Sequence, residues 1–223
     1  MAAPRCVVFD FDGVLVDSNA TKRRAYFEIF ADLDPTGELV RAAVATHGDG
    51  DRFQLIGAIC ERLVAAGQLP THGVTAATAA DFATAYNEIC EEFAATCAEI
   101  GGASAALEVL APRCALYVNS ATPQAPLRRI VARRGWEQHF RAVLGRPRSK
   151  VENLQDALER EGLAPHQAVM VGDGRHDIAA ARTLGCRFVG VRNSFNDFDT
   201  AGLPMLDDLH GLPALLAELG WEE

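Results

Sequence analysis

Two aspartates separated by one residue follow the first strongly apolar run of the chain. Asp10 and Asp12 come directly after Cys6–Phe9, a stretch in which every residue is apolar. Uninterrupted hydrophobicity of this kind is typical of a strand buried on both faces. Side chains two residues apart on a strand point the same way, and sites in parallel sheets form beyond the carboxyl ends of strands. We therefore expect both carboxylates to project into a crevice at this end.

A second pair of carboxylates follows another apolar run, at 168–171. The next residues read Gly-Asp-Gly-Arg-His-Asp, which places Asp173 at the tip of a strand and Asp177 at the start of a helix. Three or four carboxylates that converge without a cation repel one another, and a hard divalent cation would remove this repulsion. Oxygen ligands of this type suit Mg²⁺. The pattern therefore predicts a Mg²⁺ site formed by these acids.

Three other polar residues stand near the ends of apolar runs. Ser120 closes the strand predicted from the run at 115–118 and precedes a predicted helix, whose free N–H groups suit an anion. Thr122 followed by Pro123 resembles a helix N-cap with proline at the first helical position. Lys150 opens another predicted helix and supplies a compact positive charge. Ser120 and Lys150 thus favour an anion at this edge of the sheet.

Apolar runs and segments of helical spacing alternate along most of the chain. The sequence predicts strands at Cys6–Phe9, 115–118, 142–144, 168–171 and 188–191, with helices between the last four and another at about 212–219. Gly135, Gly162 and Gly185 stand where the intervening helices would end. A β-α-β-α series of this kind builds a parallel sheet flanked by helices. We therefore predict a doubly wound α/β fold with a Rossmann-like core.

The interval between the first two predicted strands breaks this alternation. It shows only helical stretches, at about 21–30, 39–45, 53–66 and 76–97. A crossover between parallel strands needs only about a dozen residues, so roughly 80 residues here predict an inserted helical domain. We place this helical cap domain at 18–98 and the α/β core at 1–17 and 99–223.

The composition narrows the class of protein. The chain has 30 acidic and 21 basic residues and a net charge of -9, which disfavours a general nucleic-acid partner. No run approaches the roughly 20 apolar residues that span a bilayer, so no membrane partner is expected. The six cysteines are far apart and without a CxxC pair, which predicts buried thiols in a reducing compartment. The first apolar run is too short for a signal peptide, so we expect a cytoplasmic protein.

Four segments together resemble the motifs of the haloacid dehalogenase (HAD) superfamily, most of whose members are phosphatases. The segment Phe-Asp-Phe-Asp-Gly-Val-Leu-Val-Asp-Ser at 9–18 resembles the first motif, and the apolar strand leading to Ser120 is similar to the second. Lys150 corresponds to the third motif, and Gly172-Asp173 with Asp177 to the fourth. The insert resembles the helical cap of the first cap class (C1), the branch of phosphoglycolate phosphatases and β-phosphoglucomutases.

The resemblance implies Mg²⁺-dependent hydrolysis of a small phosphorylated metabolite. Asp10 would attack phosphorus to form an aspartyl-phosphate, and Asp12 would protonate the leaving oxygen and then activate water. Ser120 and the backbone N–H of Ala121 would hold phosphoryl oxygens. Lys150 would neutralise the charge between Asp10 and the phosphate.

The resemblance also implies a set of metal ligands. Mg²⁺ would be bound by the Asp10 carboxylate, the Asp12 backbone carbonyl and Asp173, with Asp177 adjacent or reached through water. Three positions depart from the family pattern, where serine, proline and asparagine are common, but none of the departures removes a reactive group: Gly174, Val151 and Ala121.

Basic residues of the insert are candidates for substrate contact. Lys22 lies five residues after Asp17, where members of the family often place a residue that faces the site. Arg52 and His47 flank a glycine-containing turn, which we interpret as a specificity loop. The alternative interpretation of such residues is a solvated helix face.

Other functions fit parts of the same pattern. In a phosphosugar mutase, the phosphoryl group on Asp10 would pass to a sugar instead of water, and Asp12 is compatible with both reactions. A non-catalytic protein could keep the fold and bind phosphorylated metabolites, although the intact set of acids and Lys150 speaks against this. A dehalogenase needs neither Mg²⁺ nor the second acid, and phosphonate hydrolases typically lack an acid at the position of Asp12.

Overall fold

The computed structural model describes residues 5–47, 52–70, 76–196 and 198–218, and it divides the chain into two compact units. Met1–Asn19 and Ala94–Glu223 form the first, which we call the α/β unit, and Ala20–Phe93 form the second, the helical unit. The range expected for the insert, 18–98, includes the whole of the helical unit together with a few residues on either side.

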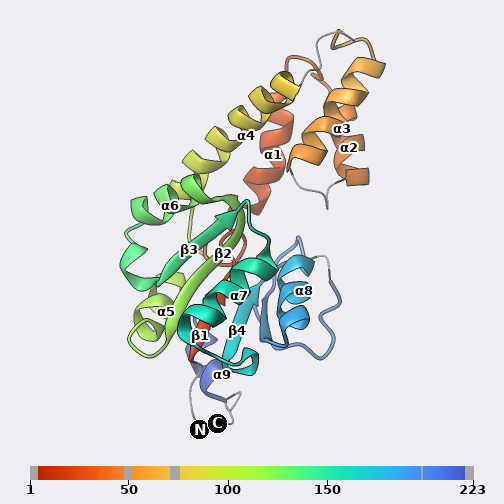
Figure 1. Ribbon diagram of the computed structural model, residues 1–223. Helices are drawn as coiled ribbons and strands as arrows, with labels where there is room; N and C mark the ends of the chain where they lie inside the picture. Colours follow the sequence, from red (N-terminus) through yellow and green to blue (C-terminus); the bar gives the residue numbers. More distant parts are fainter. Residues whose placement is uncertain (1–4, 48–51, 71–75, 197, 219–223) are drawn as a thin grey trace. The chain divides into compact units, whose positions relative to one another are not determined.

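The centre of the α/β unit is a parallel sheet with the strand order β3-β2-β1-β4-β5-β6 (Figure 1). Its strands in the described part of the chain are β1 (Cys6–Phe9), β2 (Ala115–Pro123), β3 (Ala142–Arg146), β4 (Ala168–Gly172), β5 (Arg187–Val191) and β6 (Met205–Leu206). Every strand pair is parallel. The five predicted strands are confirmed, and only the two-residue β6 was not predicted from the sequence.

Helices cover both faces of this sheet, which confirms the doubly wound α/β fold. Val7 and Phe9 of β1 belong to a core with α5 (Ala103–Leu110), α6 (Gln124–Arg133) and α9 (Leu212–Glu218). Cys6 and Val8 point the other way and belong to a core with α7 (Lys150–Glu161) and α8 (Arg175–Leu184). Because successive side chains of a strand alternate between faces, an entirely apolar strand can serve two cores at once.

Three helices of the α/β unit end at or just before the glycines that were predicted to end them. Gly162 and Gly185 cap α7 and α8 in the left-handed conformation, with φ of +62° and +79°. Gly135 has a φ of +69° just after α6. Glycine takes this conformation without the steric cost that a Cβ would add.

The prediction for the end of the second strand was wrong. β2 does not end at Ser120 but continues to Pro123, which pairs with Arg146 of β3 after a register shift. The next helix, α6, begins at Gln124, and its N-cap is Pro123 without a side-chain cap. Thr122 is therefore not the predicted N-cap, because pairing with β3 keeps this segment extended. The helix N-terminus also does not follow Ser120 directly.

The helical unit is built from α1 (Asn19–Ile29), α2 (Glu38–His47), α3 (Arg52–Ala65) and α4 (Ala76–Thr96), close to the predicted ranges. The core of this unit includes residues of all four helices that are less than a tenth exposed. Two aromatic pairs join α4 to α1 and to the residue that follows α1, with ring centroids 4.4 Å apart for Tyr26–Tyr86 and 4.3 Å apart for Phe30–Phe82. These aromatic residues therefore pack the core of this unit.

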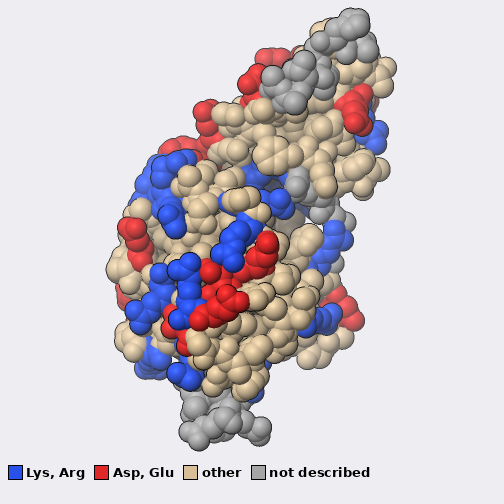
Figure 2. Space-filling view, in the orientation of Figure 1, with Lys and Arg blue, Asp and Glu red and all other residues tan. Residues whose placement is uncertain are grey.

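The cysteines and the surface charges refine what composition alone indicates. Cys6, Cys60 and Cys90 are buried thiols as predicted, but Cys97 and Cys114 are only half-buried, as is Cys186. None of the helices in the described ranges is both long enough and apolar enough to cross a membrane. Basic and acidic side chains are interspersed on the face of the α/β unit seen in Figure 2.

Helix α5 was not predicted from the sequence, and its packing generates the first prediction. Leu107 is fully buried in the core that α5 shares with the sheet, whereas Val109 on the same helix is 39% exposed. We expect Leu107→Ala to lower the free energy of unfolding by about 2–5 kcal/mol, because it leaves a cavity. Val109→Ala should change the free energy of unfolding by less than about 0.5 kcal/mol. Both variants would be measured by urea titration. Equal effects of the two substitutions would contradict this packing.

Candidate active site

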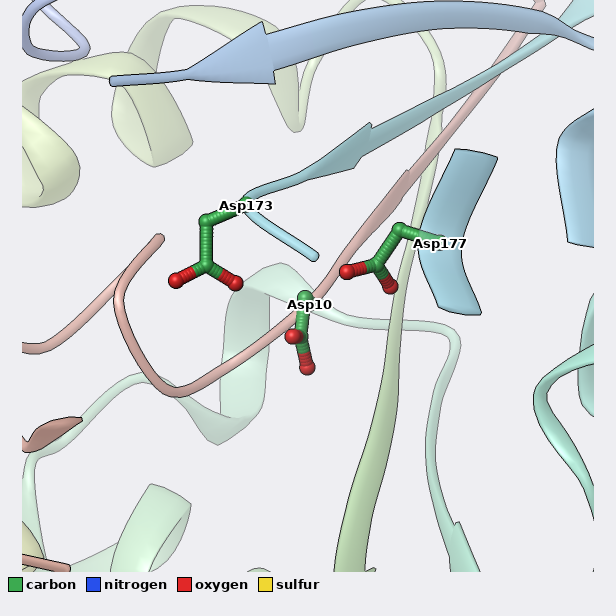
Figure 3. A group of neighbouring side chains, drawn as sticks. All are labelled: Asp10, Asp173 and Asp177. Atoms are coloured by element: carbon green, nitrogen blue, oxygen red, sulfur yellow. The ribbon is translucent and has the colours of Figure 1, made fainter. Parts of the chain in front are cut away.

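Three aspartates meet at the carboxyl ends of the central strands. Asp10 follows β1, Asp173 follows β4, and Asp177 lies in the first turn of α8. Figure 3 shows their side chains reaching toward one another from these separate segments. One oxygen of each carboxylate lies within 4.8 Å of the others, and we call the three residues the carboxylate cluster. Because β1 pairs directly with β4, the sheet itself brings Asp10 and Asp173 together.

Lys150 contacts two members of this cluster. Its Nζ lies 2.8 Å from Asp10 Oδ2 and 2.5 Å from Asp177 Oδ1. Asp10 is 7% exposed and Asp177 only 1%. Burial opposes the charge of the lysine, but the charges of Asp10 and Asp177 outweigh burial and raise the pKa of Lys150. The ammonium group therefore stays charged between the two carboxylates.

One lysine does not balance three buried carboxylates. Burial, and after it the charge of Asp10, raises the pKa of Asp173 to about 6 and also raises the pKa of Asp177. A divalent cation would remove this surplus of negative charge, and carboxylate oxygens are ligands that Mg²⁺ accepts. The donor set therefore fits the metal that the sequence pattern predicts.

The carboxylate of Asp12 has different partners. The Ser18 hydroxyl donates to its Oδ1 at 2.5 Å, and the Thr122 hydroxyl donates to its Oδ2 at 3.1 Å. Ser120 Oγ lies 3.5 Å from the same Oδ2. The Asp12 side chain is thus outside the carboxylate cluster. The metal contact expected for its backbone carbonyl stays a prediction.

The backbone at Gly13 passes very close to the cluster. Gly13 has a φ of +75°, and a Cβ on it would lie 2.0 Å from Asp173 Oδ2 and 2.3 Å from Asn19 Nδ2. Its N–H donates to the Val16 carbonyl at 2.8 Å, which closes a turn within the first motif. Only glycine satisfies both the backbone conformation and the space available.

The first turn of α7 is fixed to the sheet, and this places Lys150. The Asn119 side chain of β2 donates to the Lys150 carbonyl at 2.8 Å, and Asn153 donates to Asn119 Oδ1 at 3.2 Å. Ser149 and Glu152 form a capping box at the start of the helix. Lys150 is the first helical residue, as predicted.

A pocket of about 230 Å³ adjoins Lys150 in the α/β unit. Ser120, Ala121 and Lys150, the three residues expected to bind phosphate, all line it. Arg146, Arg148 and His176 add basic side chains to its wall. The fold thus brings the predicted phosphate-binding residues to one cavity.

The candidates in the insert all lie in the helical unit. Lys22 is on α1, and His47 is the exposed last residue of α2, with its Nδ1 2.7 Å from Thr46 Oγ1. Arg52 begins α3, donates to Asn87, and places its guanidinium 5.8 Å from the ring centre of Tyr86. The rest of the expected specificity loop, 48–51, lies outside the described residues. Substrate contact by these three residues stays a prediction.

Sequence reasoning missed several polar contacts of the site. Ser18 and Thr122 hold Asp12, and the side-chain amides of Asn19 and Asn193 each donate to Asp173 at 2.7 Å. Asn193 follows the carboxyl end of β5, so the strand-end rule that indicated Asp173 could have found it. Thr122 was interpreted as a cap because the extension of β2 was not foreseen.

The position of Gly13 generates the second prediction. Gly13→Ala should displace the side chains of Asp173 and Asn19. The free energy of unfolding should therefore fall by more than the cost of a left-handed alanine, which is about 1–2 kcal/mol. Gly135→Ala is a matched control, because Gly135 has a φ of +69° and no atom within 4 Å of its added Cβ. Urea unfolding should therefore show a clearly larger loss of stability for Gly13→Ala, and losses of the same size would count against the close approach.

Comparison with known proteins agrees with this geometry. A family model described as haloacid dehalogenase-like hydrolase matches residues 4–185. Phosphoglycolate phosphatase of Escherichia coli (strain K12) is 30% identical over 142 residues, which cover 60% of this chain and 55% of that protein. Tyrosine-protein kinase PtkA of Mycobacterium bovis is 32% identical over 201 residues, covering 85% of this chain and 62% of the relative. The chain thus spans about half the length of phosphoglycolate phosphatase.

A solved structure supports the same fold. The crystal structure of a predicted phosphoglycolate phosphatase from Haemophilus somnus 129pt has a TM-score of 0.74 and 20% identity, covering 96% of this chain and 99% of the other. At this identity the likeness concerns the fold alone. The family model, however, spans most of the sequence and includes all four motifs at the strand ends. The chain therefore belongs to the haloacid dehalogenase-like hydrolase family.

Proposed function

We propose that this chain is a Mg²⁺-dependent phosphatase that hydrolyses a small phosphate monoester through a phosphorylated Asp10. The observation that carries the proposal is the separation of two carboxylates that are neighbours in the sequence. Asp10 is paired with Lys150 inside the carboxylate cluster, whereas Asp12 is held by two hydroxyl groups outside it. Two carboxylates in different surroundings can perform two different tasks in one reaction.

Asp10 is the proposed nucleophile. The Phe11 N–H donates to its Oδ1 at 2.7 Å, and Lys150 lies 2.8 Å from its Oδ2, so the carboxylate is fixed on both sides. An Asp10 oxygen forms a bond to phosphorus while the bond from phosphorus to the ester oxygen breaks. The charge of Lys150 reduces the repulsion between this carboxylate and the phosphate dianion.

Asp12 is the proposed general acid and base. The hydroxyl groups of Ser18 and Thr122 hold its carboxylate in one orientation. In the first step it donates a proton to the leaving ester oxygen. In the second it takes a proton from water, whose oxygen attacks phosphorus and releases Asp10 and inorganic phosphate. The proton on Asp12 is thus restored at the end of each turnover.

Phosphate binding is assigned to residues around the pocket beside Lys150. Ser120 and Ala121 lie within β2, toward its carboxyl end, and line this pocket together with Lys150. Ser120 Oγ lies 3.5 Å from Asp12 Oδ2. The Ser120 hydroxyl and the Ala121 backbone N–H would hold phosphoryl oxygens. Positioning and charge stabilisation are the main requirements of phosphoryl transfer, and these residues would contribute to both.

The carboxylate cluster is the proposed Mg²⁺ site. Asp10 and Asp173 would bind the ion, Asp177 would bind it directly or through water, and the Asp12 carbonyl would complete the protein ligands. When bound, Mg²⁺ neutralises charge on the transferring phosphoryl group. The surplus of buried negative charge beside Lys150 supports this assignment.

Replacement of the nucleophile gives the third prediction. Asp10→Asn keeps the shape of the side chain but removes its negative charge, so hydrolysis of p-nitrophenyl phosphate should fall by roughly 10³-fold or more. The matched control is Asp207→Asn, since the Asp207 side chain is 87% exposed and pairs with Arg192 on the surface. The control should keep wild-type turnover. Substantial activity in folded Asp10→Asn protein would refute the assignment of the nucleophile.

The dependence on metal and pH gives the fourth prediction. EDTA should abolish hydrolysis and Mg²⁺ should restore it, because a cation must balance the carboxylate cluster. The pKa of Asp173 is raised to about 6, so in the metal-free protein this group is protonated below pH 6 and must lose its proton to bind metal. The Mg²⁺ concentration for half-maximal recovery should therefore rise as the pH falls from 7 to 5. Recovery that needs the same Mg²⁺ concentration at both pH values would argue against this site.

A further inference from the structure

The carboxylate of Asp173 receives its hydrogen bonds on one oxygen only. The Asn19 and Asn193 side-chain amides both donate to Oδ2, each at 2.7 Å. No residue in the described part of the chain donates a hydrogen bond to Oδ1. The two donors come from different elements, the first residue of α1 and the loop after β5. Asp173 itself is 8% exposed.

The orientation of the Asn193 amide is fixed by the backbone. Its Oδ1 accepts the Phe195 N–H at 2.8 Å, so the Nδ2 end must face Asp173. The Asn196 side chain also fixes this loop. Its Oδ1 accepts the Asn193 N–H at 2.9 Å. Its Nδ2 donates to the Asp173 carbonyl at 2.8 Å and to the Val191 carbonyl at 3.0 Å. The loop 193–196 is therefore folded onto Asp173 by paired contacts.

The backbone of Gly13 also lies close to Oδ2 of Asp173. A Cβ at this position would lie 2.0 Å from Oδ2 of Asp173, which shows how near the backbone comes. A carboxylate oxygen has two lone pairs, and two amide donors occupy both. With the backbone beside it as well, Oδ2 has no position left for a metal ion.

We propose that Asn19 and Asn193 are positioning residues that confine metal binding by Asp173 to a single oxygen, Oδ1, and thereby favour Mg²⁺ over Ca²⁺. The inference rests on the Mg²⁺ site of the proposed function. Ca²⁺ takes more oxygen ligands than Mg²⁺ and readily accepts both oxygens of one carboxylate, whereas Mg²⁺ is smaller and requires six ligands in octahedral geometry. A carboxylate that can bind metal through only one oxygen therefore suits Mg²⁺ better than Ca²⁺.

Metal titration by calorimetry tests this proposal without any measurement of activity. Mg²⁺ and Ca²⁺ are each titrated into the metal-free wild-type chain and into Asn19→Ala, Asn193→Ala and Asn196→Ala. Loss of a residue that hydrogen-bonds to a metal-binding side chain typically weakens metal binding by about 10- to 100-fold. We expect the Mg²⁺ Kd to rise by about that factor in Asn19→Ala and Asn193→Ala, with a smaller change for Ca²⁺, so that the preference shifts toward Ca²⁺.

Asn196→Ala is the matched control. Like Asn193→Ala it removes an acceptor for a backbone N–H of the same loop, and it also removes the donor to the Asp173 and Val191 carbonyls. It removes no donor from the Asp173 carboxylate. Its ratio of Ca²⁺ to Mg²⁺ affinity should stay close to that of the wild type. Because Asn19 and Asn193 lie on different elements, a shift of the ratio in both folded variants reports the carboxylate and not the stability of one loop.

The outcomes separate this inference from the proposed function. Wild-type protein that binds no Mg²⁺ would overturn the metal site and the inference with it. Wild-type protein that binds Mg²⁺, with an unchanged Mg²⁺ Kd and an unchanged ratio in Asn19→Ala and Asn193→Ala, would overturn the positioning role alone. A shift in Asn196→Ala as large as in Asn193→Ala would also overturn it, since loop stability would then explain the effect.

Discussion

The contact of Lys150 with both Asp10 and Asp177 is the interaction on which the site depends. Three carboxylates are buried at one edge of the sheet, and burial of like charges is unfavourable unless cations compensate for them. Lys150 compensates for part of this charge and, at 2.8 Å, orients Asp10. In the proposed function, the remaining surplus favours binding of a divalent cation and, through that cation, of a phosphate dianion. Such a site would let a chain with a net charge of -9 bind a negatively charged group.

The fold places these charges through the order of its strands. β1 lies between β2 and β4, so residues at three neighbouring strand ends come together although they are far apart in the sequence. Asn119 of β2 fixes the first turn of α7 and with it Lys150. The extension of β2 to Pro123 keeps Thr122 beside Asp12 instead of at the start of a helix. The same sheet therefore separates the surroundings of Asp10 from those of Asp12.

The sequence predicted the elements and acids that follow simple rules. Apolar runs such as Cys6–Phe9 indicated buried strands, and the strand-end rule indicated Asp10 and Asp173 without any structure. The contacts of Asn193 and Thr122 were missed because they depend on the loop after β5 and on a register shift in β2, which no local pattern encodes. Helix α5 was missed as well, since its run Ala103–Leu110 is short and the helix is stabilised by burial of residues such as Leu107.

The covalent intermediate on Asp10 is the most direct test of this account. Wild-type protein with Mg²⁺ and an aryl phosphate would be quenched in acid within the first turnovers, digested, and analysed by mass spectrometry. The account predicts one phosphoryl group on the peptide that contains Asp10, and none on that peptide from Asp10→Asn protein. Turnover by the wild type with no phosphoryl group on Asp10, or with the group on another residue, would contradict the central role of this aspartate.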